Sequence, residues 1–229
     1  MDRSRAVSVL IVAAGRGQRL GAQVPKQFLS VGGRSLIERC LAVFESVASV
    51  DDIWLVLPRG QQQRWKRLSR RFQKLRGVVA GGRQRSDSVA RGLDRVDHDG
   101  VVLVHDAARP FVSPEIIRRV VEATRRHGAA VPAMPVRDTL KREGRHGRVI
   151  ETLPRERMWA AQTPQGFRVP LLRRAFSGRK PARVPDDCAL VERLGAGIKL
   201  VRGSSLNFKV TWKDDLRLAR ALAASTATR

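Results

Sequence analysis

The residues that could do chemistry begin with a loop rich in glycine and cations, directly after the apolar block 7–12. Its glycines and cations are Gly15, Gly17, Gly21, Arg16, Arg19 and Lys26. Glycine permits positive φ and close backbone approach, so amide N–H groups can point at an anion while the cations add charge. The spacing matches neither the dinucleotide fingerprint nor the G-x-x-x-x-G-K-[ST] loop. A nucleoside triphosphate is a suitable ligand, and a turn that needs glycine only for steric reasons is the alternative.

A second candidate is Asp106, which follows the apolar run 101–104 and His105. A carboxylate at the end of a buried strand is well placed for magnesium, which prefers oxygen ligands and needs one or two carboxylates beside substrate phosphates. The alternative is that Asp106 caps a turn. We expect His105 to orient its neighbours rather than to catalyse, because phosphoryl-type transfer depends on positioning and charge neutralisation.

Other catalytic chemistries find little support in the sequence. A serine hydrolase is disfavoured because no G-x-S-x-G motif occurs. Cys40 and Cys188 have no C-x-x-C spacing and form no zinc-type set with histidine, so we expect buried thiols in a reducing cytoplasm. No stretch reaches the roughly 20 apolar residues of a membrane span, so no membrane partner is expected.

The charge of the chain does not select a function by itself. The 229 residues carry a formal net charge of +24, which attracts any polyanion. Much of the charge lies in helix-like segments such as 64–76, where Trp65, Leu68, Phe72 and Leu75 share one face and the basic side chains form a solvated surface. A nucleic-acid-binding module is the hypothesis from a different class. It is disfavoured because tyrosine is absent and the aromatic residues are expected in the core.

Strand and helix patterns alternate along the chain, which predicts an α/β fold with a mostly parallel sheet and helices on both faces. The expected strands are 7–12, 53–57, 77–80, 101–104, 129–133 and 198–201, with a further element at 208–210. The expected helices are 35–47, 64–76, a helix ending near 92, 114–127, a short one after 170, 186–194 and 213–223. Ligands bind beyond the carboxyl ends of such strands, where loops 14–27, 81–88 and 105–109 are expected to meet.

We expect residues 1–229 to form a single domain. Residues 134–158 differ from the rest because they are rich in charge and contain Pro135, Pro154 and the turn residues Gly144 and Gly147. This pattern predicts a projecting β-hairpin arm. An arm with little core of its own is typically a dimer contact, and a disordered surface loop is the alternative.

An ordered set of short motifs resembles a known enzyme family: AAGRGQRLG followed by PKQ, GGRQRSDSV, VHDAARP, PVRDTLKR, QTPQ and NFKVT. Together they resemble the 2-C-methyl-D-erythritol 4-phosphate cytidylyltransferases of non-mevalonate isoprenoid biosynthesis. The resemblance implies a Rossmann-like nucleotidyltransferase fold and a homodimer with an exchanged arm. It also implies transfer of CMP from CTP to methylerythritol phosphate, with magnesium and release of pyrophosphate. The ribitol-5-phosphate cytidylyltransferases are the runner-up, but AAG, HDAARP and RDTLK favour methylerythritol phosphate.

The resemblance also implies a role for each matching residue. The CTP-binding residues would be Ala13, Ala14, Gly15, Gly17, Gly81, Gly82, Arg85, Ser88 and Ala107, and the catalytic cations would be Arg19, Lys26 and Lys209. Asp106 would hold Mg²⁺ or another divalent cation. Arg109 and, from the neighbouring subunit's arm, Thr139 and Arg155 would receive the methylerythritol phosphate or the transferring phosphoryl group. Pro185 stands where many relatives have a hydroxyl residue, so no substrate contact is expected there.

Overall fold

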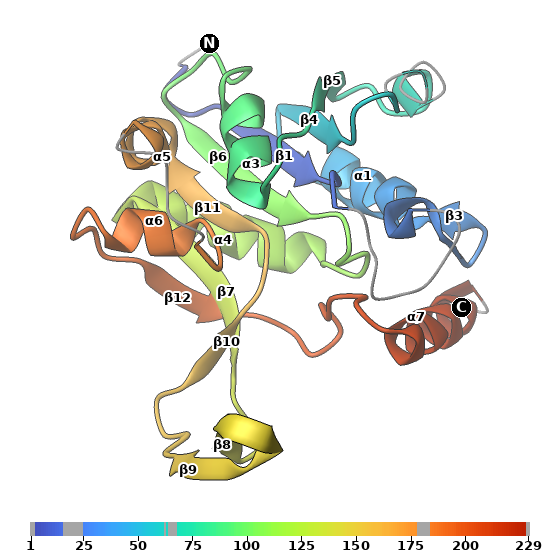
Figure 1. Ribbon diagram of the computed structural model, residues 1–229. Coiled ribbons are helices and arrows are strands. Elements are labelled where there is room, and N and C mark those ends of the chain that lie inside the picture. Colours follow the sequence, from blue (N-terminus) through green and yellow to red (C-terminus); the bar gives the residue numbers. More distant parts are fainter. Residues whose placement is uncertain (1–2, 16–24, 62, 64–67, 178–183, 228–229) are drawn as a thin grey trace.

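A computed structural model describes residues 3–15, 25–61, 63, 68–177 and 184–227. At its centre lies an 8-stranded sheet in the order β10-β7-β11-β6-β1-β4-β5, with β12 paired to β7 (Figure 1). The strands are β1 (Val7–Val12), β4 (Asp52–Leu57), β5 (Leu75–Ala80), β6 (Val101–Asp106), β7 (Ala129–Pro135), β10 (Trp159–Ala161), β11 (Gln165–Arg168) and β12 (Lys199–Arg202). Strand β1 pairs in parallel with β4 and β6, and only β10 and β11 pair antiparallel with their neighbours in this sheet. The predicted mostly parallel sheet is confirmed.

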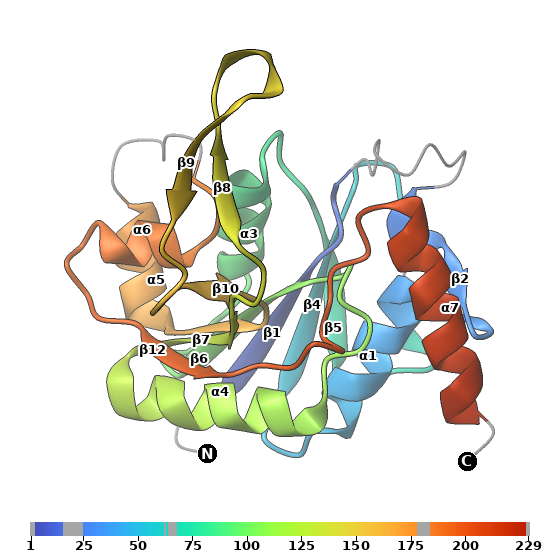
Figure 2. The same ribbon diagram turned by 90° about the horizontal axis from the view of Figure 1, so that it is seen from below.

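Helices cover both faces of this sheet (Figure 2). They are α1 (Leu36–Ser46), α3 (Arg85–Leu93), α4 (Pro114–His127), α5 (Val169–Phe176) and α6 (Cys188–Glu192). Helix α7 (Lys213–Ala227) packs instead against the short strand β2 (Ser30–Val31), in a separate apolar cluster. Along β1, Val9 and Ile11 belong to the core cluster that contains α1 and α4, whereas Leu10 belongs to the cluster of α3, α5 and α6. The apolar run of β1 is therefore buried on both faces, as a central parallel strand requires. Every helix in the described part of the chain is too short or too polar to span a bilayer.

Helix α4 shows how local chemistry sets the limits of an element. The Ser113 hydroxyl accepts a hydrogen bond from the Ile116 amide, and Pro114 occupies the first turn, where its missing N–H costs nothing. The helix ends at Gly128, whose φ of 85° is readily adopted only by glycine. The predicted helix 114–127 is confirmed at both ends.

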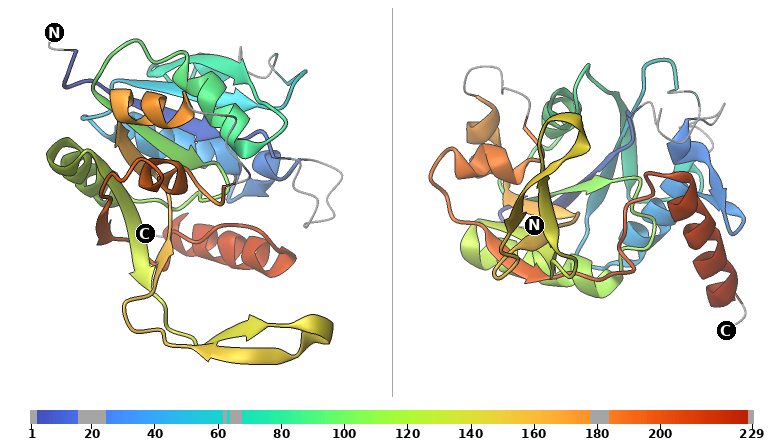
Figure 3. Two further views of the ribbon diagram at one scale, coloured as in Figure 1. Left: turned by 60° about the vertical axis from the view of Figure 1, so that its left-hand side comes forward. Right: turned by 60° about the horizontal axis from the view of Figure 1, so that its bottom comes forward.

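Residues 134–158 form an arm, as predicted. Strands β8 (Leu140–Glu143) and β9 (Val149–Leu153) pair antiparallel through a 3₁₀ turn at Arg145–Gly147. The arm projects from the body of the molecule (Figures 1 and 3). Much of its surface is exposed, including the apolar side chains of Val149 and Ile150. The hairpin lies on the chain between β7 and β10, which pair with each other at its base.

Four predictions from the sequence need correction. The helix expected over 64–76 is wrong at its end, because Leu75 begins β5 and pairs with Ile53, while residues 64–67 lie outside the described residues. The helix expected over 186–194 is limited to α6, and residues 208–210 form neither a helix nor a strand. The aromatic residues were expected in the core, but Trp159 and Trp212 are exposed.

Candidate active site

The carboxyl ends of β1 and β6 lie side by side, since Val12 pairs with Asp106 in parallel register. Beyond them opens a cleft of about 910 Å³. The predicted site residues that line it are Ala13, Ala14, Gly15, Lys26, Gly81, Gly82, Arg85, Ser88, Asp106, Ala107 and Lys209. Gly17 and Arg19 lie outside the described residues. The fold thus gathers residues from the beginning, the middle and the end of the chain, and the size of the cleft suits a small-molecule ligand.

Two loops pack directly against each other in this cleft. A Cβ atom on Gly81 would lie 2.3 Å from the Ala14 Cβ and 3.0 Å from the Ser88 Oγ. A Cβ atom on Gly82 would lie 2.1 Å from the Asp87 Cβ. Both glycines are therefore required because backbone approaches side chain too closely for any other residue. A steric requirement therefore explains the glycines of loop 81–88. For loop 14–27 the sequence left that explanation only as the alternative to anion binding.

Several amides at the strand ends are already hydrogen-bonded within the protein. The N–H groups of Ala13, Gly81 and Ala107 donate to carbonyl oxygens of the neighbouring strands at 2.8, 2.7 and 3.1 Å. The Gly82 N–H donates to the Ser88 Oγ at 3.0 Å. These four amides are not available to an anion in this conformation. Among the described residues, the cations Lys26, Arg85 and Lys209 line the cleft and can meet negative charge there.

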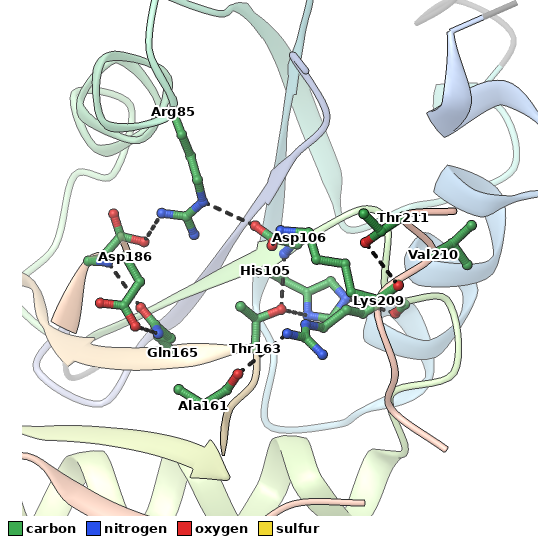
Figure 4. Close-up of polar contacts among 12 residues, drawn as sticks. Arg85, His105, Asp106, Ala161, Thr163, Gln165, Asp186, Lys209, Val210 and Thr211 are labelled. Carbon is green, nitrogen blue, oxygen red and sulfur yellow. Dashed lines mark hydrogen bonds and ion pairs between the residues drawn. The ribbon is translucent and has the colours of Figure 1, made fainter. Parts of the chain in front are cut away.

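Asp106 lies at the centre of those cations (Figure 4). Its Oδ1 atom is 3.1 Å from the Arg85 Nε, and its Oδ2 atom is 2.5 Å from the Lys209 Nζ. Burial alone would raise the pKa of Asp106, but Arg85 and Lys209 outweigh it and hold that pKa well below the usual range. The carboxylate is ionised at neutral pH. It orients two cations toward the cleft.

Asp106 also suits a magnesium ion. Among the described residues, no group of three or more histidine, cysteine or acidic side chains could hold a metal. An ionised carboxylate beside an open cleft fits the way in which magnesium binds, with one or two carboxylates, waters and substrate phosphates. Each carboxylate oxygen that accepts a hydrogen bond retains a second lone pair. Asp106 could therefore ligate the ion only together with phosphate oxygens of a bound nucleotide.

Lys209 and Lys26 approach the cleft from segments without long regular structure. The loop that carries Lys209 is fixed by the Val210 N–H, which donates to the Ala108 carbonyl oxygen at 2.8 Å. The Lys26 Nζ donates to the Val210 carbonyl oxygen at 3.4 Å. One short segment therefore brings both lysines to the same wall of the cleft. This segment is the NFKV sequence that was expected to form a regular element.

His105 orients its neighbours, as expected. The Asp106 N–H donates to the Thr163 hydroxyl, which lies 3.1 Å from the His105 Nδ1, and the His105 Nε2 lies 3.1 Å from the Arg109 carbonyl oxygen. Since a carbonyl only accepts, Nε2 carries the proton and Nδ1 accepts from Thr163. Burial lowers the pKa of His105 to about 4. The imidazole is neutral and fully used in positioning the end of β6.

Two further residues were not assigned from the sequence. Asp187 is fully buried, and its Oδ2 atom accepts a hydrogen bond from the Arg85 Nη1 at 2.7 Å. Gln165 holds the segment before α6, because its Oε1 accepts from the Asp187 and Cys188 amides and its Nε2 donates to Asp186. The paired acids after Pro185 and the last glutamine of QTPQ were the available signals. Nothing local in either motif indicated their contact.

Three predicted substrate-binding residues lie outside the lining of the cleft. The Arg109 Nη1 donates to the Asn207 carbonyl oxygen at 2.8 Å, so this guanidinium holds the loop before Lys209. Thr139 and Arg155 are exposed on the arm, and Arg155 donates to the Arg137 carbonyl oxygen. A single chain therefore does not bring Thr139 or Arg155 into its own cleft. The expectation that they act on a neighbouring subunit stays a prediction.

Neither cysteine is a nucleophile in this fold. Cys40 is buried with its Sγ 3.7 Å from the His105 Nε2, and Cys188 is 4% exposed. Burial raises the pKa of both thiols. We expect neither cysteine of the folded protein to react with a disulfide reagent at about pH 8, while both react after unfolding in guanidinium chloride. Absorbance of the released thiolate measures this, and rapid labelling without denaturant would contradict the described burial.

The chain is similar to one family throughout. The family model described as 2-C-methyl-D-erythritol 4-phosphate cytidylyltransferase matches residues 7–225. The protein of that name from Halalkalibacterium halodurans is 41% identical over 227 residues, which cover 97% of this chain and 99% of that protein. The bifunctional enzyme IspD/IspF from Anaeromyxobacter dehalogenans is 45% identical over 227 residues, and the match spans 97% of this chain and 58% of that longer protein.

A solved structure shows the same similarity in three dimensions. The crystal structure of 2-C-methyl-D-erythritol 4-phosphate cytidylyltransferase from Thermus thermophilus superposes with a TM-score of 0.80 at 43% identity. The match covers 96% of this chain and 99% of that one.

Proposed function

We propose that the cleft beyond β1 and β6 is the catalytic site of this chain, which belongs to the 2-C-methyl-D-erythritol 4-phosphate cytidylyltransferase family. The chain transfers CMP from CTP to 2-C-methyl-D-erythritol 4-phosphate, giving 4-diphosphocytidyl-2-C-methyl-D-erythritol and pyrophosphate in non-mevalonate isoprenoid biosynthesis. One observation supports the location above all: Asp106, Arg85 and Lys209 form a charged group inside a cleft whose lining also includes residues 13–15 and the glycines at 81 and 82.

CTP binds in this cleft with its base and ribose against Gly81, Gly82, Arg85 and Ser88. Its phosphates lie toward Gly15, Lys26 and Lys209, and Gly17 and Arg19 complete the phosphate site. The position of all four base and ribose contacts in the lining of one cleft supports this arrangement. Ala13 and Ala107 contribute small side chains and not amides, since their N–H groups are bonded to the sheet.

The reaction is an in-line displacement at the α-phosphorus. A phosphate oxygen of methylerythritol phosphate forms the new P–O bond as the bond to pyrophosphate breaks, and no covalent enzyme intermediate is needed. Lys26, Lys209 and Arg19 neutralise the charge that develops on the α-phosphoryl oxygens and on pyrophosphate. Asp106 would hold a magnesium ion together with the nucleotide phosphates, and that ion would supply further charge neutralisation.

The family activity is tested with purified protein, CTP and either methylerythritol phosphate or ribitol 5-phosphate. Pyrophosphate release with methylerythritol phosphate alone is the expected result. Release of pyrophosphate only with ribitol 5-phosphate would show that the chain is a ribitol-5-phosphate cytidylyltransferase. Release with neither substrate, together with salt-dependent binding of nucleic acid, would favour the basic nucleic-acid-binding hypothesis.

The active form is a homodimer whose arms are exchanged. Val149, Ile150, Met158 and Trp159 on the arm and at its base are 59%, 64%, 42% and 40% exposed, which supports a further protein surface covering them. Arg109 of one subunit and Thr139 and Arg155 of the other then receive methylerythritol phosphate.

Residues 1–229 act as one domain. The location is cytoplasmic, which the free thiols of both cysteines support.

Mixing two defective variants tests the exchange of arms. Asp106→Asn damages the cleft, and Arg155→Ala damages the arm, so each homodimer is expected to be poorly active. After denaturation and refolding as an equal mixture, half of the dimers contain one intact site, and about a quarter of the wild-type activity is expected. Activity in the mixture no higher than the mean of the two variants would show that the arm serves no partner's site.

A further inference from the structure

Asp187 occupies an unusual position for an acid. It is shielded from both solvent and the cleft: its side chain is 1% exposed, and it does not belong to the lining of the cleft. Its Oδ2 atom accepts from the Arg85 Nη1 at 2.7 Å, and among the described residues its Oδ1 atom has no hydrogen-bond partner. A buried carboxylate is costly unless it is paired. The ion pair with Arg85 is the compensation that the structure provides.

Arg85 joins this buried acid to the cleft. Its guanidinium donates from Nε to Asp106 at 3.1 Å (Figure 4). It also donates from Nη1 to Asp187, so the planar group spans two carboxylates that lie 81 positions apart in the sequence. The Arg85 side chain is 29% exposed and lines the cleft. Two contacts from different directions leave a planar guanidinium little freedom to rotate.

Asp187 is itself held in place from the sheet. Gln165 lies on β11, and its Oε1 accepts from the Asp187 amide at 3.2 Å and the Cys188 amide at 3.3 Å. Its Nε2 donates to the Asp186 Oδ2 at 2.7 Å. The buried acid is thus attached to the central sheet of the fold, not to a free loop. A fixed carboxylate can fix the cation that pairs with it.

We propose that Asp187 is a positioning residue for the nucleotide: from behind the wall of the cleft it holds the Arg85 guanidinium in the orientation that meets CTP. This inference rests on the proposed function, because it takes the cleft to hold CTP. Asp187 touches no substrate atom. Without it, Arg85 retains its charge and its contact with Asp106 but can turn about its long side chain. Binding of CTP must then also order the Arg85 guanidinium, at a cost in conformational entropy, whereas in the native enzyme this group is ordered before CTP binds.

The test is a double-mutant cycle on the full-length enzyme. Asp187→Asn keeps the size of the side chain and removes its charge, and we expect it to raise KM for CTP about tenfold with a smaller change in kcat. In the Arg85→Gln background the same change is expected to alter KM less than about twofold, because the group that Asp187 positions is gone. Glu192→Gln removes an exposed negative charge from α6, the short helix that begins directly after Asp187; it is the matched control and should leave KM unchanged.

A second variant serves if Asp187→Asn does not fold, as judged by thermal melting. Arg85→Lys keeps a cation in the cleft but has a single ammonium group that cannot span both carboxylates, and it is expected to raise KM for CTP to a similar extent. Wild-type KM in Asp187→Asn or Arg85→Lys would overturn the inference. Equal effects of Asp187→Asn with and without Arg85 would overturn it too, since a general loss of structure acts in both backgrounds. A wild-type enzyme that releases no pyrophosphate would instead overturn the proposed function on which the inference depends.

Discussion

Lys209→Met is expected to lower kcat about a hundredfold or more, which is the loss found when one preorganised stabiliser of transition-state charge is removed. The Lys209 Nζ lies 2.5 Å from the Asp106 Oδ2, and the side chain lines the cleft with 39% of its surface exposed. Methionine retains the length of the side chain without the charge. Steady-state pyrophosphate release at saturating CTP and methylerythritol phosphate measures the effect.

Lys213→Met is the matched control for this prediction. Lys213 is the next lysine along the chain and begins α7, where it is exposed and does not line the cleft. Because the net charge of the chain is +24, this control shows whether removing any lysine charge lowers kcat or whether only the Lys209 charge in the cleft matters.

Lys26→Met tests the same role from a different segment of the cleft wall. A near-wild-type kcat in the Lys209 or Lys26 variant would remove that lysine from the mechanism.

Asp106→Asn is expected to have the largest effect, a loss of about a thousandfold or more in kcat/KM. Asparagine has nearly the same shape, but it leaves Arg85 and Lys209 without the negative charge that both contact. It also removes the one ionised carboxylate that fits a magnesium ion in the described part of the cleft. Kinetics with saturating magnesium and CTP measure the loss, and dissociation constants for CTP with and without magnesium show whether the metal contributes to it.

Asp99→Asn is the control for charge in these kinetic measurements, because Asp99 is a 73% exposed acid whose ion pair with Arg173 lies on the surface.

The dependence of stability on pH gives a second check on Asp106. In the folded protein the pKa of Asp106 lies below its value in the unfolded chain, which is about 3.9. The ion pairs of Asp106 therefore contribute fully to the free energy of unfolding above about pH 3.9, and this contribution is lost as the pH falls through the lower, folded-state pKa. The difference in Tm between wild type and Asp106→Asn should therefore be constant at neutral pH and change only in acid. Wild-type activity in Asp106→Asn would contradict its place in the site.

The prediction of the fold succeeded where a pattern is local. The β-branched run of β1, the serine and proline that begin α4 and the glycine that ends it all act over a few residues. It failed where packing overrides periodicity. Leu68, Phe72 and Leu75 are buried in one core cluster, as a helix face would be, but Leu75 reaches that cluster from a strand. Periodicity alone could not reveal that change of element.

The candidate site divides along the same line. Asp106 and the small residues Ala14, Gly81 and Gly82 could be selected from the sequence because each lies in a short motif at the end of a strand. The pairing of Asp106 with Lys209 joins positions 103 residues apart, and the contact of Arg85 with Asp187 joins positions 102 apart. The Ser88 hydroxyl, which lines the cleft, accepts a hydrogen bond from the Gly82 amide, and its role as a base or ribose contact stays a prediction.

By itself, the sequence determined the alternation of strands and helices, the projecting arm, the family and the residue types available for catalysis. Only the tertiary structure decided which of these residues meet: that two cations share the carboxylate of Asp106, that a buried acid holds Arg85, and that the amides of Ala13, Gly81 and Ala107 are committed to the sheet. The physical reason is that helix and strand patterns depend on neighbours a few residues away, whereas ion pairs form over a few ångströms between segments that only the packed sheet brings together.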